Sequence, residues 1–168
     1  MKLNIKPNLH LLGMSVICAL AVMGMIIALC MPKEEQVDFI KPPFEPSAAE
    51  GIPDVSDAAG YRKISADGMP FSAYLCGNVT ANANSITVYF TNPAENTVWL
   101  KLRILDENGN ILGESGIIRQ NEYVESIMLS DSLPNNTPIK MKIMAYEPDT
   151  YHSEGAVTVK TTIHRSQT

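Results

Sequence analysis

VWLKLRILDENGNILG, residues 98–113, is the stretch that decides the fold. Its first half alternates apolar residues with Trp99, Lys101 and Arg103, and a period of two is typical of a strand with one buried face. Asn108-Gly109 then interrupts the alternation. This dipeptide suits a two-residue type I′ hairpin, because both central residues of that turn need positive φ. The stretch therefore predicts two antiparallel strands joined at Asn108-Gly109.

The same alternation recurs through the C-terminal part of the chain. Clear or partial alternation is found in residues 71–77, 85–92, 123–129, 138–146 and 155–163, with one more short strand expected near 111–118. Turn residues such as Asn92-Pro93 and Pro148-Asp149 separate these segments. We therefore predict an all-β domain over residues 69–164, an antiparallel, immunoglobulin-like β-sandwich of about seven strands.

Residues 11–31 contain neither a charge nor a proline. As a helix they would span about 31 Å, which matches the hydrocarbon core of a bilayer. Lys2 and Lys6 precede the segment, whereas acidic residues accompany Lys33, so the positive-inside rule favours a cytoplasmic N-terminus over residues 1–10. We expect a single transmembrane helix, retained as a signal anchor at the cell membrane, with the C-terminal domain extracytoplasmic.

Two other fates of this segment stay open, namely cleavage as a signal peptide and lipidation of Cys30. A signal peptide has a shorter apolar core and a small-x-small cleavage site, neither of which is evident here. Leu29 stands where a lipoprotein would place a small residue before its lipidated cysteine.

Residues 32–68 are acidic, and prolines recur between positions 32 and 53. Their few apolar residues follow no period, a composition typical of an extended and mostly unfolded spacer. We predict a disordered linker that holds the β-domain away from the membrane. A short helical turn is expected around residues 53–59.

Charge and cysteine content narrow the class of protein. The chain has 13 Lys and Arg against 18 Asp and Glu, a formal net charge of −5 at pH 7. Nucleic-acid binding needs a concentrated positive face, so we expect no nucleic-acid partner. Cys76 is the only cysteine outside the predicted span. It cannot form a disulfide within the β-domain, and we expect it to be a small buried residue of a strand.

Asp106, Asn108 and Asn110 alternate oxygen-bearing side chains in the manner of a calcium loop. An EF-hand-type loop needs glycine at its sixth position and glutamate at its twelfth. Those positions hold Ile111 and Ile117. We therefore interpret the stretch as a hairpin turn and predict no metal site.

Catalytic patterns are equally incomplete. Ser115 lies in GESGI, which matches the nucleophile elbow G-x-S-x-G until its last position. His152-Ser153-Glu154 combines base, hydroxyl and acid, but sequence neighbours on an extended chain point in different directions. No paired histidines or cysteines have zinc-ligand spacing. We therefore predict no catalytic or cofactor-binding residues, no cofactor, no small-molecule substrate and no enzyme activity.

Trp99, Lys101 and Arg103 fall together on the polar side of their predicted strand. Aromatic residues and arginine are enriched at protein interfaces, so we predict these three residues as a candidate interaction surface. The alternative is that Trp99 packs in a second layer or on a strand edge.

Residues 92–133 carry a resemblance to a known family. Their landmarks are an N-P-x-E-N turn at 92–96, a D-x-x-G turn at 106–109 and E-Y-V-E-S at 122–126, and AYEPDT follows at 145–150. With these, residues 69–163 resemble a widespread family of small surface proteins of Gram-positive, gut-type bacteria. The resemblance implies an N-terminal membrane anchor, an acidic proline-bearing linker and a compact β-domain, and it implies no established activity. Arg119-Gln120-Asn121-Glu122 replaces the proline-glycine turn that is usual in the family.

These expectations combine into one function. We expect a non-catalytic, membrane-anchored protein that presents its β-domain outside the cell, to bind a protein or a cell-envelope polymer or to form part of a surface assembly. Two alternatives stay open: an envelope-associated accessory enzyme and a calcium-stabilised adhesion module.

Overall fold

The computed structural model of the chain describes residues 9–30 and 39–165. The chain divides into two compact units, Met1–Ile40 and Lys41–Thr168. The first unit contains helix α1, Leu9–Cys30, whose leucine, alanine and methionine residues favour a helix. No helix among the described residues combines the length and apolar character needed to cross a membrane. The predicted helix over 11–31 thus exists with nearly the same bounds, but its role as a membrane span is unsupported.

The second unit is built from strands, which confirms the all-β part of the predicted fold. Its described residues form ten strands, where about seven were expected from the alternation. The strands are β1 Ala49–Glu50, β2 Tyr61–Ile64, β3 Ala73–Cys76, β4 Val79–Asn82, β5 Ser85–Asn92, β6 Trp99–Leu105, β7 Ile111–Glu114, β8 Glu122–Met128, β9 Pro138–Tyr146 and β10 Ser153–Arg165. A 3₁₀ turn, η1 Asp57–Ala59, lies where a short helical turn was predicted.

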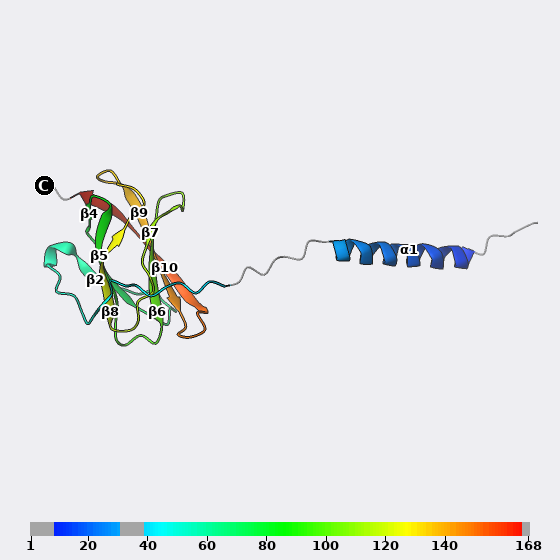
Figure 1. Cartoon of the computed structure of the whole chain (residues 1–168), viewed down its shortest axis with the longest axis horizontal. Helices are drawn as coiled ribbons and strands as arrows, with labels where there is room; N and C mark the ends of the chain where they lie inside the picture. The colour runs from blue at the N-terminus through cyan, green and yellow to red at the C-terminus, as the bar shows by residue number, and fades with distance from the viewer. Residues whose placement is uncertain (1–8, 31–38, 166–168) are drawn as a thin grey trace, which may run out of the picture. The chain divides into compact units, whose positions relative to one another are not determined.

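The strands form one curled sheet (Figure 1). Along its main path the order is β1-β8-β5-β4-β10-β9-β6-β7. Beside this path, β3 pairs with both β5 and β2. Strand β10 connects two parts of the sheet. Its residues 153–162 pair antiparallel with β9, and its residues 163–165 pair parallel with β4. Because β10 changes partner along its length, it holds the two parts in one continuous sheet.

A single hydrophobic cluster contains residues from both parts of the sheet. Three strands supply it with alternate residues: Ile86, Val88 and Phe90 from β5, Leu100, Leu102 and Ile104 from β6, and Ile139, Met141 and Ile143 from β9. None of these nine side chains is more than 2% exposed. The predicted alternation is confirmed on these strands. Full burial of one such side chain stabilises the fold by about 1.5–3 kcal/mol.

Strands β6 and β7 form the predicted hairpin, but the turn type differs from the prediction. Gly109 has a φ of +91°, whereas Asn108 is not among the described residues with positive φ. A type I′ turn needs positive φ at both residues, so the turn is of another type. The backbone N–H of Asp106 donates to the carbonyl oxygen of Asn110 at 3.0 Å. The carboxylate of Asp106 also accepts from the backbone N–H and side-chain amide of Asn110, at 2.8 and 2.7 Å.

Residues 41–68 differ from the predicted linker, because they belong to the second unit and contain β1, η1 and β2. Strand β2 pairs with β3 along its whole length. Backbone pairing therefore orders this segment although it lacks an apolar period. The remainder of the predicted linker, residues 32–38, lies outside the described residues.

Residues 41–48, named here the N-terminal strap, pack against the chain between β7 and β8. Phe44 and Ile117 form a parallel β-bridge. The backbone N–H of Glu45 donates to Ile117 at 2.8 Å, and the N–H of Ile117 donates to Pro43 at 2.9 Å. The carboxylate of Glu45 accepts from the N–H of Gly116 at 2.7 Å. A Cβ at Gly116 would lie 2.5 Å from the Glu45 nitrogen, so this approach requires glycine.

Candidate functional site

Trp99, Lys101 and Arg103 occupy alternate positions of β6, as predicted, and Trp99 is half-buried. The indole ring of Trp99 lies edge-on to Phe44 of the strap, with ring centroids 4.9 Å apart. On another side it meets Tyr151, with centroids 5.3 Å apart. Edge-to-face pairs of this kind add about 0.5–1.5 kcal/mol to the effect of burial. The strap therefore covers part of the surface that the sequence assigned to a partner.

Lys101 and Arg103 both form ion pairs with Glu114. Lys101 is only 5% exposed, and its Nζ donates to Glu114 at 2.8 Å. Arg103 Nε donates to the other carboxylate oxygen of Glu114 at 2.9 Å. Burial acts to raise the pKa of Glu114, but hydrogen bonds and positive charge from Lys101 and Arg103 outweigh it and lower the pKa. The structure thus brings the three predicted residues onto one side of β6, buries Lys101 and pairs both cations with the single carboxylate of Glu114.

Two cation–π contacts add to the packing of the strap. The guanidinium carbon of Arg119 lies 3.7 Å from the ring centroid of Phe44. The Nζ of Lys41 lies 5.1 Å from the ring centroid of Tyr151. Cation–π contacts of this type favour the docked strap. They indicate that the aromatic cluster around Trp99 is an internal contact of the second unit.

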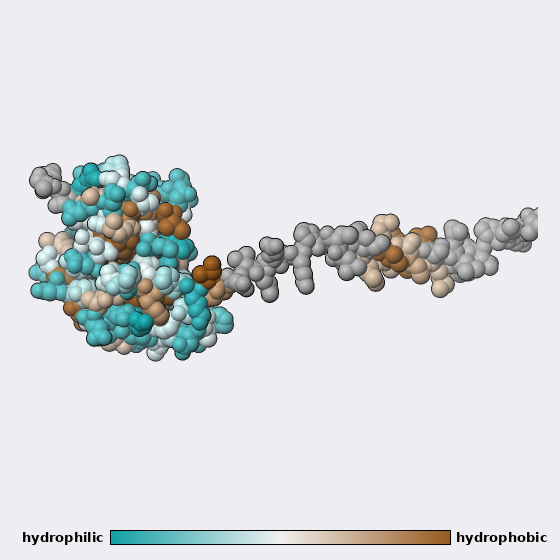
Figure 2. Space-filling view, in the orientation of Figure 1, coloured by the Kyte–Doolittle hydropathy of each residue, from teal (hydrophilic) through white to brown (hydrophobic). Residues whose placement is uncertain are grey.

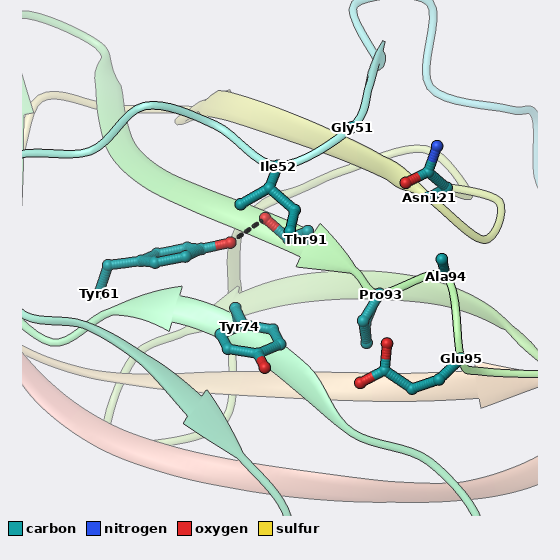
Figure 3. A pocket seen from close by; sticks show the side chains of 9 residues that line it. All are labelled: Gly51, Ile52, Tyr61, Tyr74, Thr91, Pro93, Ala94, Glu95 and Asn121. Carbon is teal, nitrogen blue, oxygen red and sulfur yellow. Dashed lines mark hydrogen bonds between the residues drawn. The ribbon is translucent and has the colours of Figure 1, made fainter.

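A pocket of about 170 Å³ lies elsewhere on this unit (Figure 3). Six chain segments meet there: the residues after β1, the three strands β2, β3 and β5, the turn after β5, and the turn before β8. The lining residues are Gly51, Ile52, Tyr61, Tyr74, Thr91, Pro93, Ala94, Glu95 and Asn121. Apolar and aromatic groups predominate, which is usual for ligand pockets. On the face of the second unit that Figure 2 shows, hydrophilic residues are interspersed with smaller hydrophobic patches.

Two tyrosines form one wall of this pocket. The rings of Tyr61 and Tyr74 stack with centroids 5.5 Å apart and planes inclined by 24°. The hydroxyl of Tyr61 donates to Thr91 Oγ1 at 2.6 Å, as Figure 3 shows. Burial is the main cause that raises the pKa of Tyr61, so its hydroxyl stays protonated at neutral pH. The opening carries Ile52, an apolar side chain that is 80% exposed.

Glu95 supplies the only acidic group of the lining, and it contacts a lysine from β2. Lys63 Nζ lies 3.4 Å from Glu95 Oε1. The same Nζ lies 6.0 Å from the ring centroid of Tyr74. A carboxylate and an aromatic face therefore converge on one ammonium group at the edge of the pocket.

Two buried asparagines hold the turn that carries Pro93, Ala94 and Glu95. Asn92 donates from its side chain to the carbonyl of Val98 at 2.9 Å, and Asn96 donates to the side-chain oxygen of Asn92 at 2.6 Å. Asn96 also accepts from the N–H of Ser72 and donates to its carbonyl, at 3.1 and 2.6 Å. These bonds at both ends of the N-P-x-E-N turn fix the pocket wall between them.

Sequence reasoning did not identify this pocket. Tyr61 fell in the predicted linker, and Tyr74 lay in the segment with weak alternation, residues 71–77. Glu95 was noted only as part of a family landmark. The available signal was the pair of asparagines in the N-P-x-E-N turn, because asparagine side chains often bond to backbone groups in turns.

The other sequence candidates occupy structural roles. Ser115 is buried, and its hydroxyl accepts from the N–H of Leu102 at 2.9 Å and donates to the carbonyl of Gly116 at 2.7 Å. His152 is exposed, 3.9 Å from Glu147. Cys76 is buried as expected, and burial raises the pKa of its thiol to about 11. Residues 9–30 and 39–165 contain no group of three or more histidines, cysteines or acids placed to hold a metal ion.

Comparison with known proteins gives little to set beside this geometry. The chain matches no family model and no curated protein. Among solved structures, CopC from Methylosinus trichosporium OB3b is similar at 14% identity and a TM-score of 0.35. That match covers 57% of this chain and 97% of CopC. At such a TM-score we infer nothing about function from it.

Proposed function

We propose that this protein is a non-catalytic binding module of the cell surface, and that the pocket beside Tyr61 and Tyr74 is its contact site. The partner is a protein or a cell-envelope polymer. The observation that carries the proposal is the pocket itself, with its stacked tyrosines and the exposed Ile52 at its opening. Aromatic side chains in a concave site supply much contact area at a small cost in conformational entropy.

The proposal includes a membrane anchor and an extracytoplasmic domain. Residues 11–31 are free of charge, and their helical length of about 31 Å suits a bilayer core. Lys2 and Lys6 on the N-terminal side support a cytoplasmic N-terminus. The resemblance of residues 92–133 to anchored surface proteins of Gram-positive bacteria points the same way. A curled sheet around one apolar cluster is what an immunoglobulin-like β-sandwich would require, and we include that architecture in the proposal.

Retention of envelope material tests the contact site. The full chain, held on a support in maltoside micelles, is incubated separately with envelope proteins and with wall polymer. We expect wild type and Tyr74→Phe, which keeps the ring, to retain one of the two fractions. Tyr74→Leu should reduce retention about tenfold, since loss of an anchoring aromatic at an interface costs more than about 1 kcal/mol. Equal retention by Tyr74→Leu would show that the pocket is not the contact surface.

Thiol labelling of intact cells tests the orientation. Glu107→Cys places a thiol in the exposed turn of the β6–β7 hairpin. In a background that carries Cys18→Ala and Cys30→Ala, a membrane-impermeant maleimide should label Glu107→Cys on intact cells. The same background without Glu107→Cys should stay unlabelled, because Cys76 is buried. Labelling of the variant only after the cells are permeabilised would place the domain in the cytoplasm.

A further inference from the structure

Lys63 lies beside the pocket and contacts two of its lining residues, Glu95 and Tyr74. Its ammonium nitrogen is 3.4 Å from the Glu95 carboxylate and 6.0 Å from the centroid of the Tyr74 ring. An aromatic face and a carboxylate around one cation are the elements by which proteins recognise organic ammonium groups. In this protein the cation comes from the chain's own neighbouring strand.

We propose that the pocket binds an organic ammonium group of its partner, which displaces Lys63 from Glu95 and Tyr74. The preferred ligand group is a quaternary or alkylated ammonium that carries apolar carbon atoms. This inference rests on the proposed function, because it names the ligand chemistry of the same pocket.

The contact between Lys63 and Glu95 is weak enough to be displaced. The two side chains are 48% and 59% exposed. Ion pairs at such exposed positions contribute about 0–1 kcal/mol, because water and salt screen them. At 6.0 Å, Lys63 also stands at the outer limit of cation–π attraction with Tyr74. Because Tyr74 lines the pocket, a ligand cation there that lies less than 6.0 Å from the ring centroid would be attracted more strongly than Lys63 is.

The remaining lining selects the kind of cation. Ile52, Pro93 and Ala94 offer apolar contact, and Tyr61 adds an aromatic ring whose hydroxyl is already bonded to Thr91. A strongly hydrated, compact cation would leave its water shell for few compensating bonds here. An ammonium group surrounded by methyl or methylene groups loses less hydration and gains contact with these side chains.

The charge of the whole unit favours the same sign of ligand. Residues 41–168 contain ten Lys and Arg against fifteen Asp and Glu, a formal net charge of −5. A negative domain raises the local concentration of cations and opposes anionic ligands.

Titration calorimetry with choline and its neutral isostere 3,3-dimethylbutan-1-ol tests the inference. The full chain is used in maltoside micelles, which contribute no choline headgroup. We expect choline to bind about tenfold more tightly than the alcohol, since a partly desolvated cation–π contact with a carboxylate nearby adds about 1–2 kcal/mol. Equal affinity for the two compounds would overturn the ammonium assignment.

Four variants locate the binding site. Glu95→Gln and Tyr74→Leu should each weaken choline binding about fivefold, whereas Tyr74→Phe should leave it unchanged. Lys63→Met removes the internal competitor and should tighten binding about threefold. Lys160→Gln and Glu154→Gln, which make the same changes in charge at exposed positions outside this pocket, should have no effect. Choline binding that ignores both Glu95→Gln and Lys63→Met would place the ligand elsewhere and overturn the proposal.

The two proposals fail in different ways. If choline and the alcohol bind alike while Tyr74→Leu still loses envelope material, the ammonium inference is wrong and the pocket remains the contact site. If Tyr74→Leu retains envelope material as wild type does, the proposed function is wrong, whatever the calorimetry gives.

Discussion

At the scale of single residues, the amides of Asn92 and Asn96 join three separate parts of the chain. Asn92 is 0% exposed and Asn96 is 7% exposed. Their side chains satisfy backbone groups of Ser72 and Val98 that strand pairing leaves open. A buried backbone group that loses its partner costs about 1–3 kcal/mol, so these asparagines cannot be replaced by apolar residues of similar size.

Asn96→Ala should therefore lower the free energy of unfolding by about 2–4 kcal/mol, because it leaves the N–H and carbonyl of Ser72 unpaired. Urea denaturation followed by circular dichroism measures the change. The neighbouring Thr97→Ala, at an exposed position, serves as the control and should change the free energy by less than about 0.5 kcal/mol. Equal midpoints for the two variants would contradict the role given to this network.

A second residue-scale feature is the carboxylate of Glu114 between Lys101 and Arg103. Its pKa lies below the usual 4.5 in the folded protein, because the two cations outweigh the effect of burial. A lowered folded-state pKa means that the ionised form favours folding. This contribution is complete above the unfolded-state pKa and is lost as the pH falls through the folded-state pKa.

The stability of wild type should fall as the pH is lowered from 6 to 3, and the fall should be smaller in Glu114→Gln. At pH 7 the variant should be less stable than wild type, since Lys101 is left buried without its counter-charge. Thermal melts across this pH range give the comparison. Glu154→Gln, at an exposed position, should follow wild type. Parallel curves for wild type and Glu114→Gln would show that the ion pairs do not favour folding.

At the scale of elements, the N-terminal strap packs against the sheet although it is not one of the ten strands. Phe44 anchors it by contact with Trp99 and Arg119. The bridge to Ile117 and the carboxylate of Glu45 fix its register. Loss of the phenyl ring removes the aromatic contacts and leaves the backbone bonds.

Phe44→Ala should shift the fluorescence of Trp99 to longer wavelength, because the indole gains contact with water. The chain contains one tryptophan, so the signal reports this site alone. The free energy of unfolding should also fall by about 2–4 kcal/mol. This is somewhat less than the loss expected for a fully buried phenylalanine, because Phe44 is only half-buried. Ile40→Ala, at a position that is 85% exposed, is the control and should leave the spectrum unchanged. An unshifted spectrum in Phe44→Ala would mean that the strap does not shield Trp99.

The elements differ in how far sequence predicts them. Alternation located β5, β6 and β9 because each has one buried face, and that face determines the pattern. It missed β2 and the strap, because these are ordered by backbone pairing and by single aromatic contacts. It also gave the wrong turn type at Asn108-Gly109, since the dipeptide signal does not include the side chain of Asp106.

The candidate site was harder to predict than the fold. The alternation places Lys101 on the polar side of β6 and so predicts that it is exposed. It is instead buried, because its ammonium group pairs with Glu114. Tyr61 and Tyr74 come together only because β2 pairs with β3, a contact that neither residue's local sequence implies. A site that forms where two strands of weak hydrophobic alternation pair can be located only from the structure.

At the scale of the whole molecule, β10 connects the two parts of the sheet. Its residue Ile163 is fully buried, and it exchanges backbone bonds with the loop that precedes β9. The N–H of Ile163 donates to Thr137 at 2.9 Å, and its carbonyl accepts from Asn136 at 2.8 Å. Because this point joins β9, β10 and β4, its loss affects both parts of the sheet.

Ile163→Ala should destabilise the whole second unit by about 2–4 kcal/mol and should do so in one transition. Circular dichroism reports the sheet, and fluorescence of Trp99 reports β6, so the two midpoints should move together. Thr158→Ala, at an exposed position of the same strand, should leave both midpoints near wild type. Separate midpoints in Ile163→Ala would show that the two parts of the sheet unfold independently.

The position of the strap also determines how the second unit would respond to a pulling force. In the chain, residue 41 directly follows the segment that leads to α1, so tension from the N-terminal side reaches the strap before any strand. The strap is held through Pro43, Glu45 and Ile117, whereas β9 and β10 share a long ladder. The strap should therefore detach at a lower force than the sheet. Its release would lengthen the segment before β1 by up to about 26 Å while the core stays folded, so the strap is an extensible element at the N-terminal end of the second unit.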